Sequence, residues 1–355
     1  MAGGCGTRFW PVSRTDTPKQ FMFVPELGKS LLQDTYERFS EILPKENILI
    51  VTVQKYKDAV LEQIPDLQSE NLLLEPYGRD TAPCVAYATC KILQRDCNAT
   101  TIVSPADHII GEKEKFQNSV LGALKHVAEN DVLMTIGLVP KSPDVNFGYI
   151  QVTGGKNPKL EGAIKVKTFT EKPDAELAKV FLQTGEFLWN SGVFIWNART
   201  IIEEMQKHIP EVIDLFKGWE NKLGTISEQK FIQAAYGGCT RISLSYGILE
   251  RTDRAWVWPA DFSWNDVGSW ESLYDHKSSV KDKDGNIVLG AKHILDEDKD
   301  NMIVTTNKGK LIAIRGLENF LVVDTEDALL ICPREDKRFK DLISQLAMPE
   351  FEKYR

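Results

Sequence analysis

The sequence has no apolar run that could cross a membrane and no surplus of positive charge. Apolar stretches such as 132–139 are far shorter than the roughly 20 residues of a membrane-spanning helix. Lys and Arg number 43 against 51 Asp and Glu, so the net charge is −8. Proteins held by nucleic-acid phosphates usually carry the opposite sign. We expect neither membrane nor nucleic acid as a partner, although a local basic pocket could still hold a small phosphate ligand.

Cysteine is scarce and poorly spaced for metal or disulfide chemistry. The six cysteines include no CxxC pair, and no histidine lies at metal-ligand spacing beside them. A disulfide-rich secreted domain and a zinc site are therefore not expected. The N-terminus also lacks the basic segment and apolar core of a signal peptide. These absences predict a cytoplasmic protein with reduced thiols.

Strand-like and helix-like patterns alternate from about residue 48 to residue 139. Nearly continuous apolar runs predict strands, and apolar residues at helical spacing predict the helices between them. The strands are expected at 48–53, 71–75, 100–104 and 132–139, and the helices at 56–64, 82–93 and 112–127. Buried strands separated by helices favour a parallel sheet that is covered on both faces.

The rest of the chain divides into a mixed part and a β-rich part. In the mixed part we expect strands at 149–152, 164–170, 187–197 and 255–259, a helix near 174–183, and long helical stretches over 198–236. From 284 to 333, short β runs separated by turn residues follow one another without a long helix. We predict an α/β domain over 1–280 and a small all-β domain over 281–355. The boundary is expected near 278–284, and a closing helix at about 335–347.

The segment 2–20, AGGCGTRFWPVSRTDTPKQ, has the composition of a phosphate-binding loop. Its glycines let the backbone approach a ligand, and successive N–H groups in such a loop form an anion-binding concavity. The spacing matches neither GxGxxG nor the P-loop GxxxxGK[ST]. A glycine turn with solvated charges is the plain alternative. The segment also has three cations, Arg8, Arg14 and Lys19, and the glycines together with Arg8 and the Pro18–Lys19 corner favour the phosphate cradle.

Through GGxGTRxWPxSRxxxPKQ the sequence resembles the nucleotide-sugar pyrophosphorylases, and specifically the mannose-1-phosphate guanylyltransferases. Further blocks follow in the family's order: EPYGRDTAP (75–83), PADH (105–108), FGYI (147–150), FTEKP (169–173), WNSGVF (189–194) and FSWNDVGSW (262–270). The resemblance implies a Rossmann-like nucleotidyltransferase domain with a mixed, mostly parallel sheet, followed by a small β-helix-like domain. It also implies an enzyme that makes GDP-mannose and pyrophosphate from GTP and mannose 1-phosphate, with Mg²⁺ as its cofactor.

The residues expected to bind the nucleotide lie in the glycine loop and in the block at 75–83. Arg79 and Asp80 follow a predicted strand and precede a helix, where open α/β sheets bind their ligands. Without the resemblance, an ordinary strand–helix turn would explain them as well. The resemblance extends the nucleotide set to Ala2, Gly3, Gly4, Gly6, Thr7, Arg8, Lys19, Glu75, Gly78, Arg79, Asp80 and Thr81.

Two aspartates are candidate metal ligands. Asp107 comes just after the predicted strand 100–104, and Asp266 lies in a turn flanked by tryptophans. Taken alone, each would be interpreted as a cap or turn residue. The resemblance pairs them as ligands of Mg²⁺, a cation that is often held by one or two carboxylates together with substrate phosphates. His108 is expected to support the site rather than to act as a base.

A third group of residues is expected to bind the sugar phosphate: Gly148, Glu171, Lys172 and Asn190. Lys172 fits a phosphate as a point charge, and Glu171 can accept hydrogen bonds from sugar hydroxyls. Asn190 is expected in a tight Asn-Ser-Gly turn, although a plain core strand is the alternative for 187–197. We expect Arg8 and Lys19 to neutralise the triphosphate while Lys172 holds the nucleophile, which makes these three cations catalytic.

Two other functions stay open. One is the same chemistry on another sugar 1-phosphate or another nucleotide. The second is a catalytically silent homologue that binds GDP-mannose and regulates a partner. Such a homologue would be expected to lose some of the residues Arg8, Lys19, Asp107 or Asp266, and all four are present. The oligomeric state is also open, with a homodimer among the options.

Three features depart from the family pattern. The glycine loop begins at Gly3, where the family's first strand would just have ended. This predicts that the natural product starts several residues upstream, and that in the present chain Gly3 to Arg14 is mobile and activity is low. Ser245 stands where relatives usually carry Asp. The stretch 281–355 leaves no room for the phosphomannose isomerase domain of some relatives, which predicts a single activity.

Overall fold

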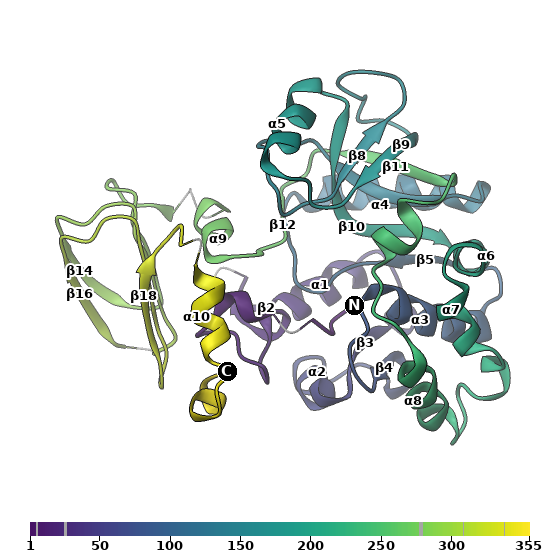
Figure 1. Ribbon diagram of the computed structural model, residues 1–355, viewed down its shortest axis with the longest axis horizontal. Coiled ribbons are helices and arrows are strands. Elements are labelled where there is room, and N and C mark those ends of the chain that lie inside the picture. Colours follow the sequence, from purple (N-terminus) through teal and green to yellow (C-terminus); the bar gives the residue numbers. More distant parts are fainter. Residues whose placement is uncertain (5, 25–26, 277–279, 308, 337) are drawn as a thin grey trace.

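The computed structural model describes residues 1–4, 6–24, 27–276, 280–307, 309–336 and 338–355. A large α/β part carries most of the helices, and a smaller β part lies at the opposite end of the molecule (Figure 1). The predicted domain boundary near 278–284 falls partly on 277–279, which lie outside the described residues, and its position stays a prediction.

A six-stranded sheet forms the centre of the α/β part, in the order β5-β10-β7-β11-β9-β8. These strands are β5 (Thr100–Val103), β10 (Phe187–Asn197), β7 (Leu133–Leu138), β11 (Ala255–Ala260), β9 (Ile164–Thr170) and β8 (Tyr149–Val152). The sheet is mixed, as predicted, but the expectation of a mostly parallel sheet is wrong. Only β7 and β11 pair in parallel among its described pairs. The long strand β10 runs antiparallel to β5, β7 and β8, and it separates the strands that were expected to be neighbours.

Helices cover both faces of this sheet. Helix α4 (Lys113–Glu129) buries Phe116, Val120 and Val127 on one face, because these positions recur at helical spacing. It packs against β7, β10 and β11. The other face is covered by α3 (Thr81–Arg95), α6 (Ala198–His208) and α7 (Pro210–Ile213), which share one apolar core with it.

A separate parallel pair, β3 (Ile50–Val53) and β4 (Leu72–Glu75), lies beside the main sheet. Helices α1 (Leu31–Ser40) and α2 (Lys57–Gln63) pack near it. Helix α1 was not predicted, although its start has a clear signal. The side chain of Ser30 accepts from the backbone of Gln33, and the Gln33 side chain accepts from the backbone of Ser30, which is a capping box.

Shorter elements complete the α/β part. The helices are α5 (Ala175–Thr184), α8 (Glu228–Gly238) and α9 (Trp270–His276), with a π-helix at Ser245–Leu249. Two strand pairs are added, β1 (Phe23–Val24) with β2 (Lys29–Ser30) and β6 (Ile109–Ile110) with β12 (Trp264–Asn265). Within the described ranges, no helix is long and apolar enough to cross a bilayer.

The C-terminal part is a small β-helix-like domain. One sheet contains β13 (Ile287–Leu289), β15 (Met302–Thr305), β17 (Phe320–Asp324) and β18 (Leu329–Pro333), and a second pairs β14 (Lys292–Asp296) with β16 (Leu311–Arg315). Buried asparagines connect successive turns: Oδ1 of Asn286 accepts from Asn301, and Oδ1 of Asn301 accepts from Phe320. Helix α10 (Phe339–Gln345) lies within the predicted closing helix.

Candidate functional site

The glycine loop is shaped by close packing against Lys19. Gly6 has φ +42°, and a Cβ at this position would lie 2.6 Å from the backbone nitrogen of Lys19. Only glycine can hold the two backbone segments this close. The buried amide of Gln20 donates to the carbonyls of Ala2 and Gly4, at 2.8 and 3.0 Å. Sequence reasoning missed Gln20, although it directly follows Lys19 in the signature.

The remaining loop residues lie close by. Thr7 and Arg8 belong to a short 3₁₀ helix, Thr7–Phe9, that follows the loop. Gly3 lies against Glu75, whose Oε2 would be 3.1 Å from a Cβ on Gly3. The structure thus brings the start of the loop next to the end of β4.

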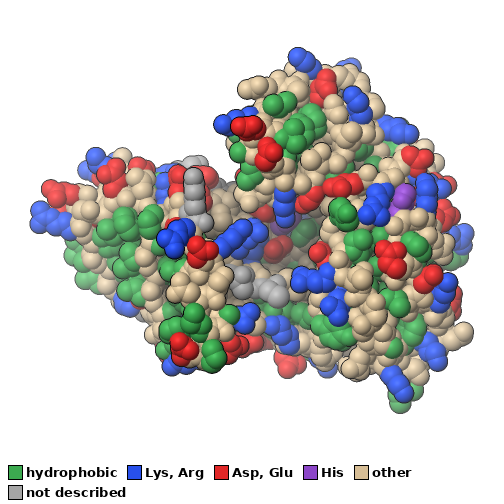
Figure 2. Space-filling view, viewed as in Figure 1, with side chains coloured by type: hydrophobic (Ala, Val, Ile, Leu, Met, Phe, Trp, Pro, Cys, Tyr) green, Lys and Arg blue, Asp and Glu red, His purple; other side chains and the backbone are tan. Residues whose placement is uncertain are grey.

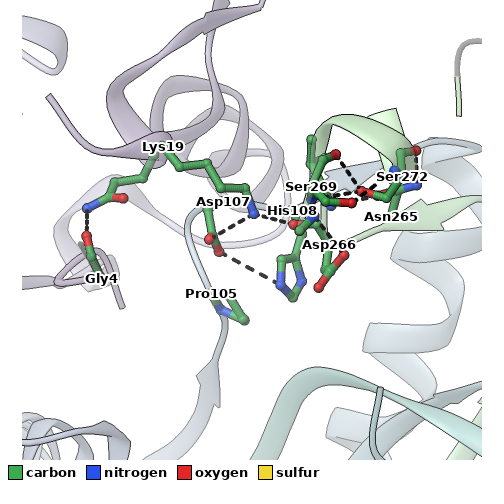
Figure 3. Close-up of polar contacts among 12 residues, drawn as sticks. Gly4, Lys19, Pro105, Asp107, His108, Asn265, Asp266, Ser269 and Ser272 are labelled. Carbon is green, nitrogen blue, oxygen red and sulfur yellow. Dashed lines mark hydrogen bonds and ion pairs between the residues drawn. The ribbon is translucent and has the colours of Figure 1, made fainter. Parts of the chain in front are cut away.

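Lys19 connects the loop to both predicted metal ligands (Figure 3). Its Nζ donates to Oδ2 of Asp107 at 3.0 Å and also to the backbone carbonyl of Asp266. The Lys19 side chain is only 9% exposed, so these contacts are shielded from water. In the part of the chain that is described, no group of three or more His, Cys, Asp or Glu side chains could hold a metal.

The electrostatics of the two aspartates differ. Burial alone would raise the pKa of Asp107, but the positive charge of Lys19 and its hydrogen bond lower it overall. For Asp266 burial prevails and raises the pKa, and the negative charge of Asp107 adds to the effect. An added cation between the two carboxylates would offset both burial and mutual repulsion.

His108 lies beside Asp107, and its Nε2 is 3.8 Å from Oδ1 of Asp107. Its Nδ1 accepts from Nε1 of Trp264 at 3.2 Å, and burial lowers its pKa to about 4. A neutral imidazole at this position agrees with a supporting role rather than a charged one. Its Cε1 lies 3.5 Å from where a Cβ on Gly192 would be, so the site reaches strand β10.

Three of the predicted sugar-phosphate residues form one cluster. Backbone N–H of Asn190 donates to the carbonyl of Gly148 at 2.8 Å, and a Cβ on Gly148 would lie 2.8 Å from Oε2 of Glu171. This Oε2 is buried and has no hydrogen-bond partner within the described chain. Burial raises the pKa of Glu171, while Lys172 and Ser245 act against the rise. A sugar hydroxyl would satisfy the Oε2 atom.

Asn190 lies in a bulge of β10, and the predicted tight turn is wrong. The pairing of β10 with β7 shifts between Asn190 and Phe194, and Gly192 has φ +76°. Oδ1 of Asn190 accepts from the hydroxyl of Thr135 at 2.8 Å. Lys172 follows Glu171 with φ +46°, and its exposed Nζ lies 3.8 Å from Oε1 of Glu171.

The block after β4 is held by Tyr236, which sequence reasoning missed. The Tyr236 hydroxyl donates to Oε1 of Glu75 at 2.8 Å, and Nε of Arg79 donates to the Tyr236 carbonyl at 3.4 Å. Asp80 caps α3 by accepting from the backbone of Thr81, in an unusual conformation with φ +71°. Such strained backbone is common at functional sites.

Two other members of this block differ in their packing. Thr81 has a structural contact, because its hydroxyl accepts from the backbone of Leu244 at 2.8 Å. A Cβ on Gly78 would meet no atom within 4 Å, so packing does not require glycine there.

The two arginines of the signature have different surroundings. Arg8 is exposed, and within the described residues its guanidinium makes no hydrogen bond or ion pair. Arg14 instead pairs with Asp327 at 2.7 Å and donates to the carbonyl of Tyr354 at 2.8 Å. The same carbonyl accepts from Nε1 of Trp10. Arg14 therefore connects the loop segment to the C-terminal domain, whereas Arg8 has no such contact.

The molecular surface has a central hollow (Figure 2). Figure 2 shows this hollow below the lobe that carries α5, β8 and β9, with acidic and basic side chains on its walls. The site residues come from distant parts of the chain: the glycine loop, the two aspartates and the sugar cluster. The strands of the mixed sheet and the bulge in β10 bring them together.

The burial of Glu75 can be tested by measuring how thermal stability depends on pH. Burial raises its pKa to about 7, above the ordinary value of 4.5, so the folded state retains a proton that the unfolded state releases. The contribution of Glu75 to stability must therefore fall as pH rises through this window. We compare the melting temperature of Glu75→Gln with that of the parent at two pH values. The difference, variant minus parent, is expected to be a few degrees larger at about pH 8 than at about pH 5.

The matched control is Glu70→Gln, because Glu70 is exposed in the short helix before β4. Its melting temperature is expected to differ from the parent by the same amount at both pH values. A pH-independent difference for Glu75→Gln would contradict the burial argument.

Two family models match different parts of the chain. Residues 1–283 match the family described as nucleotidyl transferase, which is most of the chain. The chain belongs to the nucleotidyl transferase family. Residues 292–346 match a second family, the MannoseP isomerase/GMP-like beta-helix domain. The nucleotidyl transferase fold is thus followed by a β-helix-like domain, as predicted.

Relatives of this nucleotidyl transferase cover nearly its whole length. It is 36% identical to mannose-1-phosphate guanylyltransferase of Salmonella montevideo, over 97% of the chain and 73% of the relative. It is 35% identical to the xanthan biosynthesis protein XanB of Xanthomonas campestris pv. campestris (strain B100), over 98% of the chain and 72% of the relative. The crystal structure titled mannose-1-phosphate geranyltransferase, from Thermus thermophilus, superimposes with a TM-score of 0.86, at 29% identity and 98% coverage of both chains.

Proposed function

We propose that this nucleotidyl transferase makes GDP-mannose and pyrophosphate from GTP and mannose 1-phosphate. One observation carries the proposal: Lys19 beneath the glycine loop is hydrogen-bonded to both Asp107 and Asp266. A cationic loop beside two carboxylates suits a triphosphate. Relatives named mannose-1-phosphate guanylyltransferase, at 33–36% identity, support the choice of GTP and mannose 1-phosphate.

The proposed reaction depends mainly on how the two substrates are positioned. A phosphate oxygen of mannose 1-phosphate forms the new bond to the α-phosphorus of GTP, and the bond between that phosphorus and the leaving pyrophosphate breaks. The attacking phosphate is already ionised near neutral pH, so the site needs no strong general base. The work of the protein is alignment and charge stabilisation.

The carboxylates fit Mg²⁺ as the metal of this reaction. Burial and the charge of Asp107 raise the pKa of Asp266, which indicates a site where a divalent cation would relieve repulsion. Asp107 and Asp266 would hold it, and it would supply charge neutralisation at the phosphate oxygens. Lys19 and Arg8 would hold the triphosphate, and the buried Oε2 of Glu171 would accept from a sugar hydroxyl.

A substrate panel tests the proposal. Four nucleoside triphosphates are assayed against mannose 1-phosphate and glucose 1-phosphate, with pyrophosphate release as the signal. GTP with mannose 1-phosphate is expected to exceed every other pair by at least about tenfold. Preference for another pair would move the assignment to a different sugar or nucleotide. Tight binding of GDP-mannose without any pyrophosphate release would instead indicate a regulatory homologue.

The two exposed cations should affect different kinetic constants. Lys172 lies beside Glu171 in the sugar cluster, whereas Arg8 follows the glycine loop. Lys172→Ala is expected to raise KM for mannose 1-phosphate about tenfold, and Arg8→Ala is expected mainly to lower kcat. The exposed Lys217, in the helical region after α7, provides a control for loss of a surface charge. Equal increases of this KM in both variants would refute the division of roles.

A further inference from the structure

Helix α9 lies between the α/β domain and the β-helix-like domain (Figure 1). It begins just after the turn 265–269, which carries Asp266. Two hydrogen bonds connect this turn to the helix. Nδ2 of Asn265 donates to the carbonyl of Ser272 at 3.2 Å, and backbone N–H of Ser272 donates to Oγ of Ser269 at 3.1 Å. The position of Asp266 therefore depends on the position of α9.

The turn 265–269 and the β-helix-like domain share one apolar core. Val267 is 4% exposed and belongs to the same buried cluster as Trp270 of α9 and Phe9, which follows the glycine loop. The β-helix-like domain contributes to this cluster with residues that include Ile287, Met302, Leu321 and Val323. Val267 has φ +45°, which is unfavourable for a β-branched residue and persists only where the surroundings enforce it. The shared core therefore holds the turn in its conformation.

An ion pair also connects α9 to the β-helix-like domain. Arg334 directly follows β18, and its Nη1 donates to Oε1 of Glu271 at 2.9 Å. Cζ of Arg334 lies 3.6 Å from the centre of the Tyr274 ring, one turn further along α9. The Tyr274 hydroxyl in turn donates to the carbonyl of Gly285 at 2.7 Å. Arg334 thus contacts two successive turns of the helix.

This ion pair is shielded from water. The Arg334 side chain is 9% exposed, and Oε2 of Glu271 is buried with no hydrogen-bond partner within the described residues. Burial raises the pKa of Glu271, and the positive charge of Arg334 acts against the rise. A buried charge that loses its ion-pair partner is strongly destabilising. Without Arg334, we expect α9 to move until the Glu271 carboxylate reaches water.

We propose that Arg334 is a positioning residue for nucleotidyl transfer, because it holds α9 and, through α9, the turn that carries Asp266. The inference rests on the proposed function, since this turn affects turnover only if Asp266 helps to bind the metal and GTP. The residues predicted to bind substrates or Mg²⁺ all lie before position 267, in the α/β domain. Arg334 extends the functional residues into the β-helix-like domain.

The test compares Arg334→Met, which removes the charge, with Arg334→Lys, which keeps it. In Arg334→Met the Mg²⁺ concentration for half-maximal pyrophosphate release is expected to rise at least about fivefold, and kcat to fall about tenfold. Arg334→Lys should recover most of both losses. The control is Arg315→Met, because Arg315 is exposed on the same domain and pairs with Asp296 on its surface. An Mg²⁺ requirement in Arg334→Met that equals that of the parent would overturn the proposal.

Amide hydrogen exchange in 265–272 provides a readout that needs neither metal nor turnover. Below the melting temperature of each variant, exchange is expected to be at least about tenfold faster in Arg334→Met and unchanged in Arg315→Met. Exchange as slow as in the parent would refute the positioning role. The two proposals fail differently. A parent without guanylyl transfer contradicts the proposed function, whereas an active parent whose Mg²⁺ requirement is unaffected by Arg334→Met contradicts this inference.

A double variant shows whether Arg334 acts through Glu271. In Glu271→Leu with Arg334→Met no buried carboxylate is left without its partner, so the double variant is expected to retain more activity than Arg334→Met alone. Losses that simply add would contradict this route. Should Arg334→Met not fold, Glu271→Gln is measured in the same way, because glutamine keeps the size of the side chain. A parent-like Mg²⁺ requirement and exchange in Glu271→Gln would then overturn the proposal.

Discussion

Replacing Asp266 or Asp107 with asparagine is expected to lower kcat by at least about a hundredfold, with the fold retained. Both residues contact Lys19, Asp107 through its carboxylate and Asp266 through its backbone carbonyl. Asparagine keeps the size and most hydrogen bonds but removes the charge. Turnover is measured by pyrophosphate release, and circular dichroism checks the fold.

The metal titration decides what Asp107 does. If it is a ligand, Asp107→Asn should raise the Mg²⁺ concentration for half-maximal activity. If it only positions Lys19, activity should fall equally at every Mg²⁺ concentration. Asp261 is the control, because its carboxylate is half-exposed and pairs with Lys115 on the surface. Asp261→Asn is expected to behave like the parent. Retention of more than about a tenth of the activity by Asp266→Asn would contradict the proposed metal site.

Gly6→Ala is expected to lower kcat/KM by about a hundredfold. The new Cβ would lie 2.6 Å from the nitrogen and 2.7 Å from the Cβ of Lys19, so one of the two segments must move. Displacement of Lys19 would disturb its bonds to both aspartates. A shift of this kind far exceeds the tolerance of a phosphoryl-transfer geometry.

The variant Gly218→Ala is a control that distinguishes the steric clash from backbone strain. Gly218 also has a positive φ, +80°, but a Cβ there would meet no atom within 4 Å. Gly218→Ala therefore has the strain without the clash, and its kcat/KM should stay near that of the parent. Should both variants lose activity alike, the close approach of Gly6 to Lys19 would not be the cause.

Local patterns were enough to predict most elements of the fold. The strands 48–53, 71–75, 100–104 and 132–139 are confirmed as β3, β4, β5 and β7, because buried strands are continuous apolar runs. A small all-β domain was recognisable from the short β runs, and its β-helix-like form was implied by the family resemblance, but β14 was missed. Four of its five residues, in Lys292–Asp296, are exposed, so the strand has no continuous apolar signal.

Strand partners could not be predicted in the same way. The pattern of 187–197 predicts a strand, but its antiparallel pairing with β5 and β7 depends on contacts between distant residues. The bulge at Asn190 follows from the same pairing, because a register shift needs a partner strand.

The main residues of the candidate site were predicted from the sequence, but the residues that hold them in position were not. Lys19, Asp107 and Asp266 were singled out as phosphate or metal groups, and the structure brings them together. Gln20 and Tyr236 hold the loop and Glu75 in place, yet neither residue type is distinctive in sequence. The roles of all these residues stay predictions until the variants are measured.

The contact between the glycine loop and residues 354–355 has a consequence for biosynthesis. Trp10 and Arg14 donate to Tyr354, and Thr15 donates to Arg355, across more than 300 positions of the chain. Domains generally fold in the order in which the ribosome makes them. Here the loop emerges first, but its partners are translated after the whole β-helix-like domain. The contacts of Trp10, Arg14 and Thr15 with this segment therefore cannot form until residues 354–355 have been translated, so this junction is expected to close after the α/β domain has begun to fold.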